Sequence, residues 1–196
     1  MPLHLSPAPA PALRSVLAAL GSPTAVREAP VPALRTHQGP LSPDHPLPVH
    51  VWDDVSRPGG TPHTRLAGWS FLVRGGERAV ATAEAMLTAD GWTFARFCGG
   101  PYVASTERAL AQAEALSAPH QPRLLSVPEL YMLTLWLHHD TESDGAEGEP
   151  APGDLLIPLA PAPPGIASHR PHPVADLLPR LTLRLASSSP LLREPA

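Results

Sequence analysis

The chain contains no lysine, a single cysteine and few aromatic residues. All 14 of its basic residues are arginine, and aromatic residues make up 5% of its 196 positions. The lone cysteine, Cys98, excludes an internal disulfide framework and any zinc site built from several cysteines. A formal net charge of -4 argues against a strongly basic nucleic-acid-binding protein. One cysteine also fits a reducing compartment, so we expect a cytoplasmic protein.

Long apolar runs and nucleotide-binding motifs are absent as well. The N-terminal stretch MPLHLSPAPAPALRS has no basic start, and prolines interrupt the apolar core that a signal peptide needs. No apolar run approaches the roughly 20 residues of a membrane span. The glycine pairs match neither a phosphate-binding loop nor a dinucleotide fingerprint. We therefore expect neither membrane association nor a cofactor.

Proline is the residue in greatest excess. The chain has 28 prolines, whereas average usage of about 5% would give roughly ten. Eleven of them fall in residues 1–48. Because proline lacks the backbone N–H and pushes the preceding residue away from helix, we predict that 1–47 form a Pro-rich extension, extended or disordered. One short helix, Leu13–Leu20, is expected within it and should end at Gly21.

The middle of the chain contains an imperfect internal repeat. Gly68-Trp69-Ser70-Phe71 is followed by a glycine pair and ERAVATAEAML, and Gly91-Trp92-Thr93-Phe94 by a glycine pair and, after an insertion, ERALAQAEALS. The aromatic pair of each copy should share one strand face, and the alanine- and glutamate-rich segment after it favours helix. In the first copy, the glycine pair could instead turn a hairpin, which would make the segment from Arg78 a second strand.

These patterns predict an α+β fold, in which a small sheet is built around two β-α units and packed by helices. The domain should cover 48–186, followed by a C-terminal tail, 187–196. The expected strands are 49–55, 68–74, 91–98 and 154–159; the expected helices are 101–117, 126–139 and, with the hairpin as its alternative, 77–88. The stretch 140–154 has six acidic residues and no basic one, and should form a mobile loop.

The predicted helix 126–139 has almost no polar face. A helix that is apolar all round lies either in the core or in an interface. We therefore predict an association surface at Leu130, Leu133, Trp136 and Leu137. With a Pro-rich arm that could dock on partners, this favours a non-enzymatic protein-binding or assembly module that contacts a protein partner or itself.

Cys98 carries an alternative, enzymatic hypothesis. It lies at the end of a predicted strand and just before a helix, where a helix N-terminus can favour a thiolate and glycine amides can stabilise an oxyanion. The chain would then be a cysteine-dependent hydrolase or transferase. No histidine is fixed as its base by the sequence, and a free cysteine is commonly a small buried residue.

A second alternative uses the aromatic strands. Trp69, Phe71, Trp92 and Phe94 could stack on the bases of a single-stranded nucleic acid. The residue before the second strand is Asp90, where an RNA-recognition strand has a basic residue. Because scarce aromatic residues usually lie in the core, nucleic-acid binding remains possible but is not favoured.

Two segments resemble metal-binding patterns but lack essential features. The segment from Asp140 begins like a calcium loop, but Ala151 stands where the bidentate carboxylate belongs. A zinc set drawn from His138, His139, Asp140, His169 and His172 is also disfavoured. Neighbouring histidines on a helix point in different directions, and an acidic loop separates the two halves of the set. We therefore predict no metal site.

Overall fold

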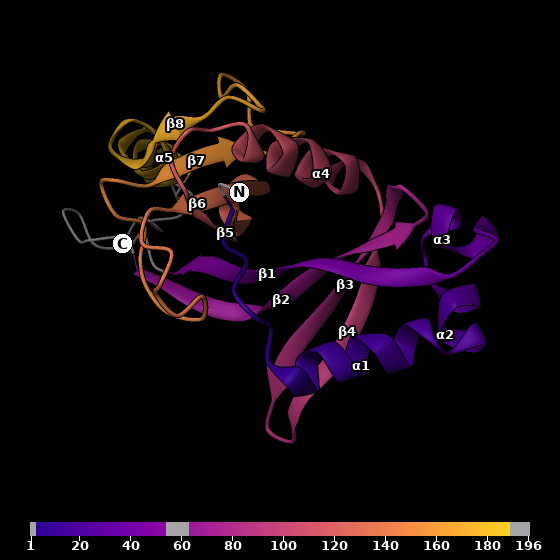
Figure 1. The fold of residues 1–196 in the computed structure, drawn as a ribbon. Helices are drawn as coiled ribbons and strands as arrows, with labels where there is room; N and C mark the ends of the chain where they lie inside the picture. The colour runs from indigo at the N-terminus through magenta and orange to yellow at the C-terminus, as the bar shows by residue number, and fades with distance from the viewer. Residues whose placement is uncertain (1–2, 54–62, 189–196) are drawn as a thin grey trace, which may run out of the picture.

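The computed structural model describes residues 3–53 and 63–188, which form one mixed eight-stranded sheet with helices on both faces (Figure 1). The expected α+β class is confirmed. The elements are α1 (Ala10–Leu20), α2 (Pro23–Glu28), α3 (Pro32–Thr36), β1 (Leu41–Asp53), β2 (His63–Gly75), β3 (Arg78–Thr88), β4 (Gly91–Cys98), α4 (Pro101–Glu114), β5 (Gln121–Val127), the 3-10 turn η1 (Pro128–Leu130), β6 (Met132–His138), β7 (Leu155–Pro158), β8 (His172–Pro173) and α5 (Val174–Ser188).

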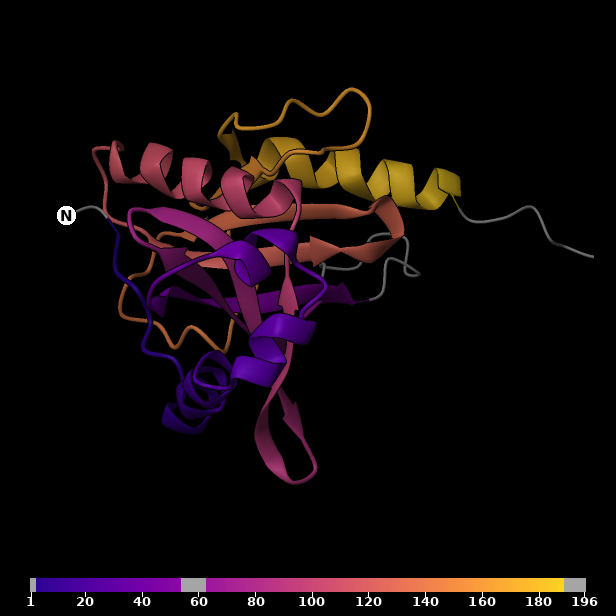
Figure 2. The ribbon, with the colours of Figure 1, turned by 90° about the vertical axis from the view of Figure 1, so that its right-hand side faces the viewer.

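The sheet consists of two antiparallel meanders joined by one parallel pair. Its strand order is β4-β3-β2-β1-β5-β6-β7-β8, and only β1 and β5 run parallel. Parallel neighbours need a crossover connection, which α4 supplies between β4 and β5. The β3–β4 hairpin projects beyond the helices in two perpendicular views (Figure 1, Figure 2).

Alternate side chains of the strands face two different helical layers. In the first meander, Trp69 and Phe71 pack with α1–α3, while Leu72 packs with α4. In the second meander, Leu124 packs with α4, while Leu125 packs with α5. Since strand side chains alternate between faces, α4 covers one face of the sheet, and α1–α3 and α5 cover the other.

Three helices, α1–α3, occupy most of the chain from Ala10 to Thr36, so the prediction of a largely disordered or extended arm is wrong. The helix expected over Leu13–Leu20 is confirmed as α1, and two further helices follow it. Each of the three has proline in its first turn, where the backbone N–H needs no partner. Ala12 and Val16 are fully buried against the sheet. The prolines therefore begin helices here instead of preventing them.

Strand β1 begins at Leu41, ahead of the boundary expected at Pro48, although three of its residues are proline. Proline cannot donate to a ladder and is normally confined to sheet edges and bulges. The proline-containing half of β1 pairs only with β2, because pairing with β5 is restricted to Val49–Val51. An irregularity between Asp44 and Leu47 interrupts the register around Pro46. The prolines of β1 therefore lie in the half of the strand that is paired on one side only.

The segment 77–88 is strand β3, so the helix predicted for it is wrong and the hairpin alternative is confirmed. Gly76 forms the turn with a φ of 71°. Ala81, Ala83 and Ala85 are buried at every second position, whereas Thr82 and Glu84 between them are only partly buried. The period of two in the alanines is a strand signal, and it outweighs the helix propensity of the composition.

The helix predicted for 126–139 is also wrong. Val127 ends β5, η1 turns the chain, and the apolar run continues as β6, antiparallel to β5. Strand β6 is buried on both faces: Leu135 and Leu137 face α4, while Trp136 faces α5. A strand enclosed by two layers is apolar at nearly every position, which explains the missing polar face.

The other predicted elements agree with the structure. Strands 68–74, 91–98 and 154–159 correspond to β2, β4 and β7, and helix 101–117 corresponds to α4. The predicted strand 49–55 is the end of β1, and its last two residues lie outside the described part. The region 174–188 forms one helix, α5, with Pro179 inside it. Most of the predicted tail 187–196 lies beyond the described residues.

Arg123 is a fully buried cation that holds the segment between β6 and β7. Its side chain donates to Oε1 of Gln121 (2.7 Å), Oγ of Ser143 (2.8 Å) and the carbonyl oxygens of Asp144 (3.1 Å) and Glu147. Its guanidinium lies 4.8 Å from the centre of the Trp136 ring. Three of these four acceptors belong to the acidic segment, which therefore lies against the sheet.

Asp154 holds the other end of that segment and is also fully buried, where a solvated acidic residue was expected. Its carboxylate accepts from Nε1 of Trp136 (2.7 Å), from the backbone N–H of Ala151 and His139 (both 2.9 Å), and from Nδ1 of His138 (2.9 Å) and of His139 (2.7 Å). Burial alone would raise the pKa of Asp154, but the hydrogen bonds from His138, Ala151 and His139 outweigh it and hold the pKa well below its usual range.

Replacement of Arg123 tests whether it anchors the segment. Arg123→Met keeps much of the apolar stem but leaves the carbonyl oxygens of Asp144 and Glu147 without their donor. We expect the free energy of unfolding, measured by urea denaturation, to fall by about 3 kcal/mol. Arg14→Met, which removes an exposed arginine from α1, is the matched control and should change it little. Equal effects of the two variants would contradict an anchoring role.

His50 makes the stability pH-dependent. Burial lowers its pKa to about 4, and its Nε2 donates to the carbonyl oxygen of Gly145 at 2.9 Å. The unfolded chain protonates this histidine near pH 6.5, whereas the folded protein keeps it neutral to about pH 4. Stability therefore falls as the pH drops from 6.5 to 4, by up to about 3 kcal/mol. In His50→Leu this part of the pH dependence should disappear, as seen in urea titrations at several pH values; in His4→Leu, which replaces an exposed histidine, it should remain.

Candidate functional site

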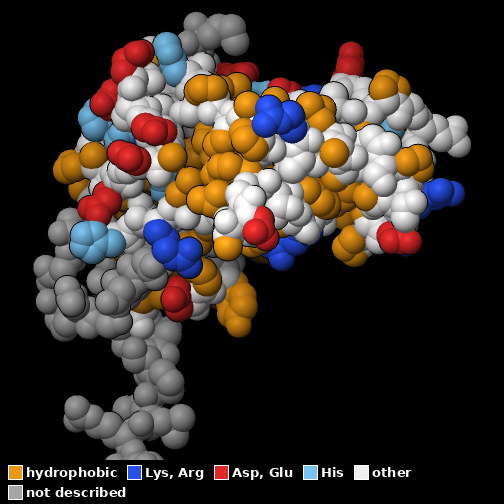
Figure 3. All heavy atoms as spheres, turned by 90° about the horizontal axis from the view of Figure 1, so that it is seen from below, with side chains coloured by type: hydrophobic (Ala, Val, Ile, Leu, Met, Phe, Trp, Pro, Cys, Tyr) orange, Lys and Arg blue, Asp and Glu red, His pale blue; other side chains and the backbone are white. Residues whose placement is uncertain are grey.

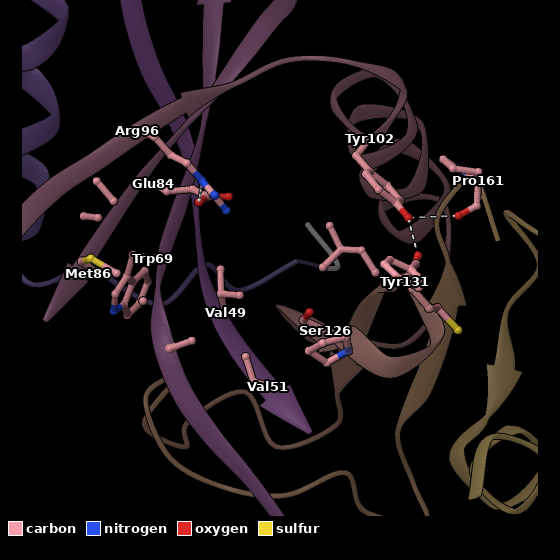
Figure 4. Close-up of a pocket in the computed structure, with 17 residues that line it drawn as sticks. Val49, Val51, Trp69, Glu84, Met86, Arg96, Tyr102, Ser126, Tyr131 and Pro161 are labelled. Atoms are coloured by element: carbon pink, nitrogen blue, oxygen red, sulfur yellow. Dashed lines mark hydrogen bonds and ion pairs between the residues drawn. The ribbon is translucent and has the colours of Figure 1, made fainter. Parts of the chain in front are cut away.

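Helix α4 leaves part of its face of the sheet uncovered, and a groove lies there. Seventeen residues line it, and the hollow has a volume of about 780 Å³ (Figure 4). The lining comes from β1–β4 on one side and from α4, β5, η1, β6 and the loop after β7 on the other. The groove therefore lies where the two meanders meet.

The sheet side of the groove is apolar, with one charged pair. Val49 and Val51 of β1 form its centre, and Met86 of β3 lies toward the projecting hairpin (Figure 4). Nε of Arg96 lies 2.7 Å from Oε2 of Glu84, so the two charges compensate each other at the upper rim. Arg96 belongs to β4, which is an edge strand of the sheet, so the groove extends to that edge.

Two tyrosines form the opposite wall. The hydroxyl of Tyr102, in the first turn of α4, donates toward the carbonyl oxygens of Tyr131 (2.9 Å) and Pro161 (3.1 Å) (Figure 4). This one side chain thereby fixes the turn before β6 and the loop after β7 relative to α4. Burial raises the pKa of Tyr102, so the hydroxyl keeps its proton at neutral pH.

Tyr131 is strained and exposed at the same time. Its φ is 50°, in the left-handed region that bulky residues rarely adopt, at a cost of roughly 1–2 kcal/mol. The residue is nevertheless 89% exposed at the rim of the groove. Glycine would adopt this backbone conformation at a lower cost. Backbone strain of this kind is often found at functional sites.

The four residues predicted to form an association surface do not share one. Trp136 and Leu137 are fully buried on opposite faces of β6. Leu130 packs toward α5, and Leu133 lines the groove. The expected common helix face does not exist because the segment is a strand and turn. Leu133 is the single member of the set that reaches the groove.

The four aromatic residues of the nucleic-acid hypothesis pack toward α1. Trp69 and Phe71 are 2% and 1% exposed, and Trp92 and Phe94 are partly buried against the same cluster. Each pair shares a sheet face, as expected from strand alternation. These positions favour a role in the core, because a ring must be accessible to stack on a base.

Cys98 lies at the end of β4, half-buried beside Glu84 and Arg96. Burial raises the pKa of its thiol, and the negative charge of Glu84 raises it further, against an opposing effect of Arg96. A nucleophilic cysteine needs the opposite shift, toward the thiolate. The surroundings of Cys98 therefore favour an inert thiol.

No local sequence pattern pointed to the groove residues. Met86 lies in β3, Tyr102 in α4 and Tyr131 in the turn before β6, so only the folded chain brings them to one groove. Comparisons with models of protein families, with curated proteins and with solved structures found no match. Among the described residues, no helix is both long and apolar enough to cross a membrane.

The raised pKa of Cys98 predicts a slow thiol. At pH 7.5, iodoacetamide should alkylate Cys98 in the folded protein more slowly than it alkylates the urea-unfolded chain. The rate should rise with pH and reach half its maximum above the ordinary thiol pKa of about 8.5. Mass spectrometry of quenched samples measures the rate. Rapid labelling that persists at mildly acidic pH would instead favour the enzymatic hypothesis.

Proposed function

We propose that this protein is a non-enzymatic binding module, which takes an extended, apolar segment of a protein partner in the groove between the two meanders. The observation that carries the proposal is the apolar hollow with an exposed Tyr131 on its wall. Soluble proteins rarely leave such a concave apolar surface open unless something binds there. This keeps the binding function predicted from the sequence but moves it to a different surface.

The shape of the groove favours a polypeptide over a small molecule. Small-molecule sites usually enclose most of the ligand surface. Here Met86, part of the lining, is itself 46% exposed, and Tyr131 at the rim is 89% exposed. A small ligand in the hollow would leave much of these two residues in water. An extended chain that enters at the sheet edge and passes Val49 toward Tyr131 would cover them.

The residue types are those of a binding surface. Tyrosine gives a large contact area with little loss of side-chain entropy, and methionine adapts to side chains of different shape. The Glu84–Arg96 pair lies where the backbone of a bound segment would need polar partners. Because the pair is neutral overall, it selects no strongly charged partner. We therefore expect recognition of spaced apolar side chains.

A library of random displayed peptides tests this function without a known partner. Wild-type protein should enrich peptides with regularly spaced apolar residues, and fluorescence anisotropy gives their affinities. Tyr131→Gly should weaken binding at least about tenfold, or ~1.4 kcal/mol. The same change relieves the left-handed backbone, so the melting temperature should stay the same or rise. Binding and stability would then move in opposite directions, which misfolding cannot produce.

A second variant, Met86→Glu, places a charge in the groove, and Leu17→Glu is its matched control. Leu17 is 48% exposed on α1, on the other face of the sheet, and Met86 is similarly exposed in the groove. Only the Met86 variant should lose peptide binding. Failure to enrich any peptide, or enrichment that neither groove variant changes, would refute the proposal. Binding of short fatty acids or apolar dyes without any peptide binding would point to a small-molecule site instead.

A further inference from the structure

Three potential metal ligands converge at the end of β6. The register pairs Leu137 with Leu155, which brings His138, the last residue of β6, beside Asp154, the residue before β7. The chain bends at His139, so its ring turns back toward the same carboxylate. Nδ1 of His138 lies 2.9 Å from Oδ2 of Asp154, and Nδ1 of His139 lies 2.7 Å from Oδ1. All the ligand atoms lie within 4.8 Å of one another.

We propose that His138, His139 and Asp154 form a binding site for a transition-metal ion of the zinc type, with water completing its coordination. Two imidazoles and a carboxylate are a ligand set that zinc accepts in proteins. Tetrahedral bonds of about 2.0–2.1 Å place ligand atoms roughly 3.3 Å apart. The separations between each Nδ1 and its carboxylate oxygen need to open by only about half an ångström to admit the ion.

The proton balance of binding is simple. Each imidazole now donates the Nδ1 proton to Asp154. A ring that binds the ion carries its proton on Nε2 and offers the Nδ1 lone pair, so the change is one of tautomer and no proton is lost. The carboxylate already acts as an acceptor only, taking five hydrogen bonds from Trp136, His138, His139 and Ala151. The ion therefore replaces two hydrogen bonds without requiring a new charge on the protein.

The surroundings of the carboxylate suit a ligand of this kind. Trp136 Nε1 and the backbone N–H of Ala151 donate to Oδ2, and they can stay in place when the ion binds. Such outer donors orient metal-binding carboxylates in general. Gly153 matters as well: a Cβ there would lie 3.3 Å from Cγ and 3.4 Å from Nδ1 of His139. The absence of a side chain leaves room beside that ring.

Access and charge both favour a cation. The side chain of His139 is 53% exposed, that of His138 10% and that of Asp154 0%, so the site opens to solvent on one side only. Acidic and histidine side chains gather on the side of the molecule where this segment lies (Figure 3). The six acidic residues of 140–154 outweigh the one buried cation nearby, Arg123. The segment therefore attracts positive ions to the site.

Titration of chelator-treated protein with zinc chloride in a calorimeter tests the proposal. We expect saturable binding of one ion per chain and, with Co²⁺ as a probe, visible absorption bands typical of tetrahedral coordination. His139→Ala should weaken binding by more than about tenfold, since loss of even an outer partner has that effect. The variant should still fold, because His139 is the exposed member of the set. Circular dichroism spectra of the wild type and of His139→Ala check that both proteins are folded.

His63→Ala is the matched control. His63 is also exposed, and its Nδ1 lies 2.5 Å from Oε1 of Glu149 in the same acidic segment. This variant should bind zinc as the wild type does. Absence of saturable zinc binding, equal weakening in both variants, or calcium binding as tight as zinc binding would overturn the proposal. The last two results would indicate diffuse attraction by the acidic residues, with Asp154 serving only to fix the segment.

Discussion

The second half of the fold depends on one buried contact, that of Trp136 with the guanidinium of Arg123 and the carboxylate of Asp154. The indole donates to the carboxylate at 2.7 Å, and the guanidinium lies 4.8 Å from the centre of the indole ring. A buried charge is costly unless nearly all its hydrogen-bonding capacity is used. Arg123 and Asp154 meet that requirement through bonds with the segment between β6 and β7: Arg123 bonds to its middle, and Asp154 bonds to His139 and Ala151 near its two ends. The same bonds that satisfy the charges therefore position the sixteen residues 139–154, which lack regular secondary structure.

This dependence explains why the acidic segment was difficult to interpret from sequence. Its composition is that of a solvated loop, and Asp140, Glu142 and Asp144 fit that description, as they lie at or near the surface. The acceptors through which the segment is held are mainly backbone carbonyl oxygens, and these are present whatever the side chains are. Their partner, Arg123, lies twenty residues earlier on a strand that was not predicted. A pattern of side chains could not reveal an anchor made of main-chain acceptors.

The errors in secondary structure have a common physical cause. ERAVATAEAML and ERALAQAEALS have nearly the same composition, but the first follows a tight glycine turn and forms a strand, while the second follows Pro101 and forms a helix. The alanines of β3 recur at every second position and lie against α1, and this spacing was visible in the sequence. In β6, burial on both faces removed the alternation that identifies a strand. The class of the fold and four of its strands were predictable; the pairing of the two meanders was not.

The groove and the buried polar groups around Arg123 and Asp154 lie on opposite faces of the same central strands. Val49 of β1 and Ser126 of β5 line the groove, whereas the next residue of β1, His50, and Arg123 of β5 face the other way. Because side chains alternate along a strand, one strand contributes residues to both faces of the sheet, and different elements cover the two faces. The loop 139–154 and α5 cover the face with the buried charges, and α4 covers only part of the groove's face. The fold thus leaves part of one face uncovered and encloses Arg123 and Asp154 on the other. Because the two sites share strands but no side chains, a substitution in one can be compared with a substitution in the other within a single folded protein.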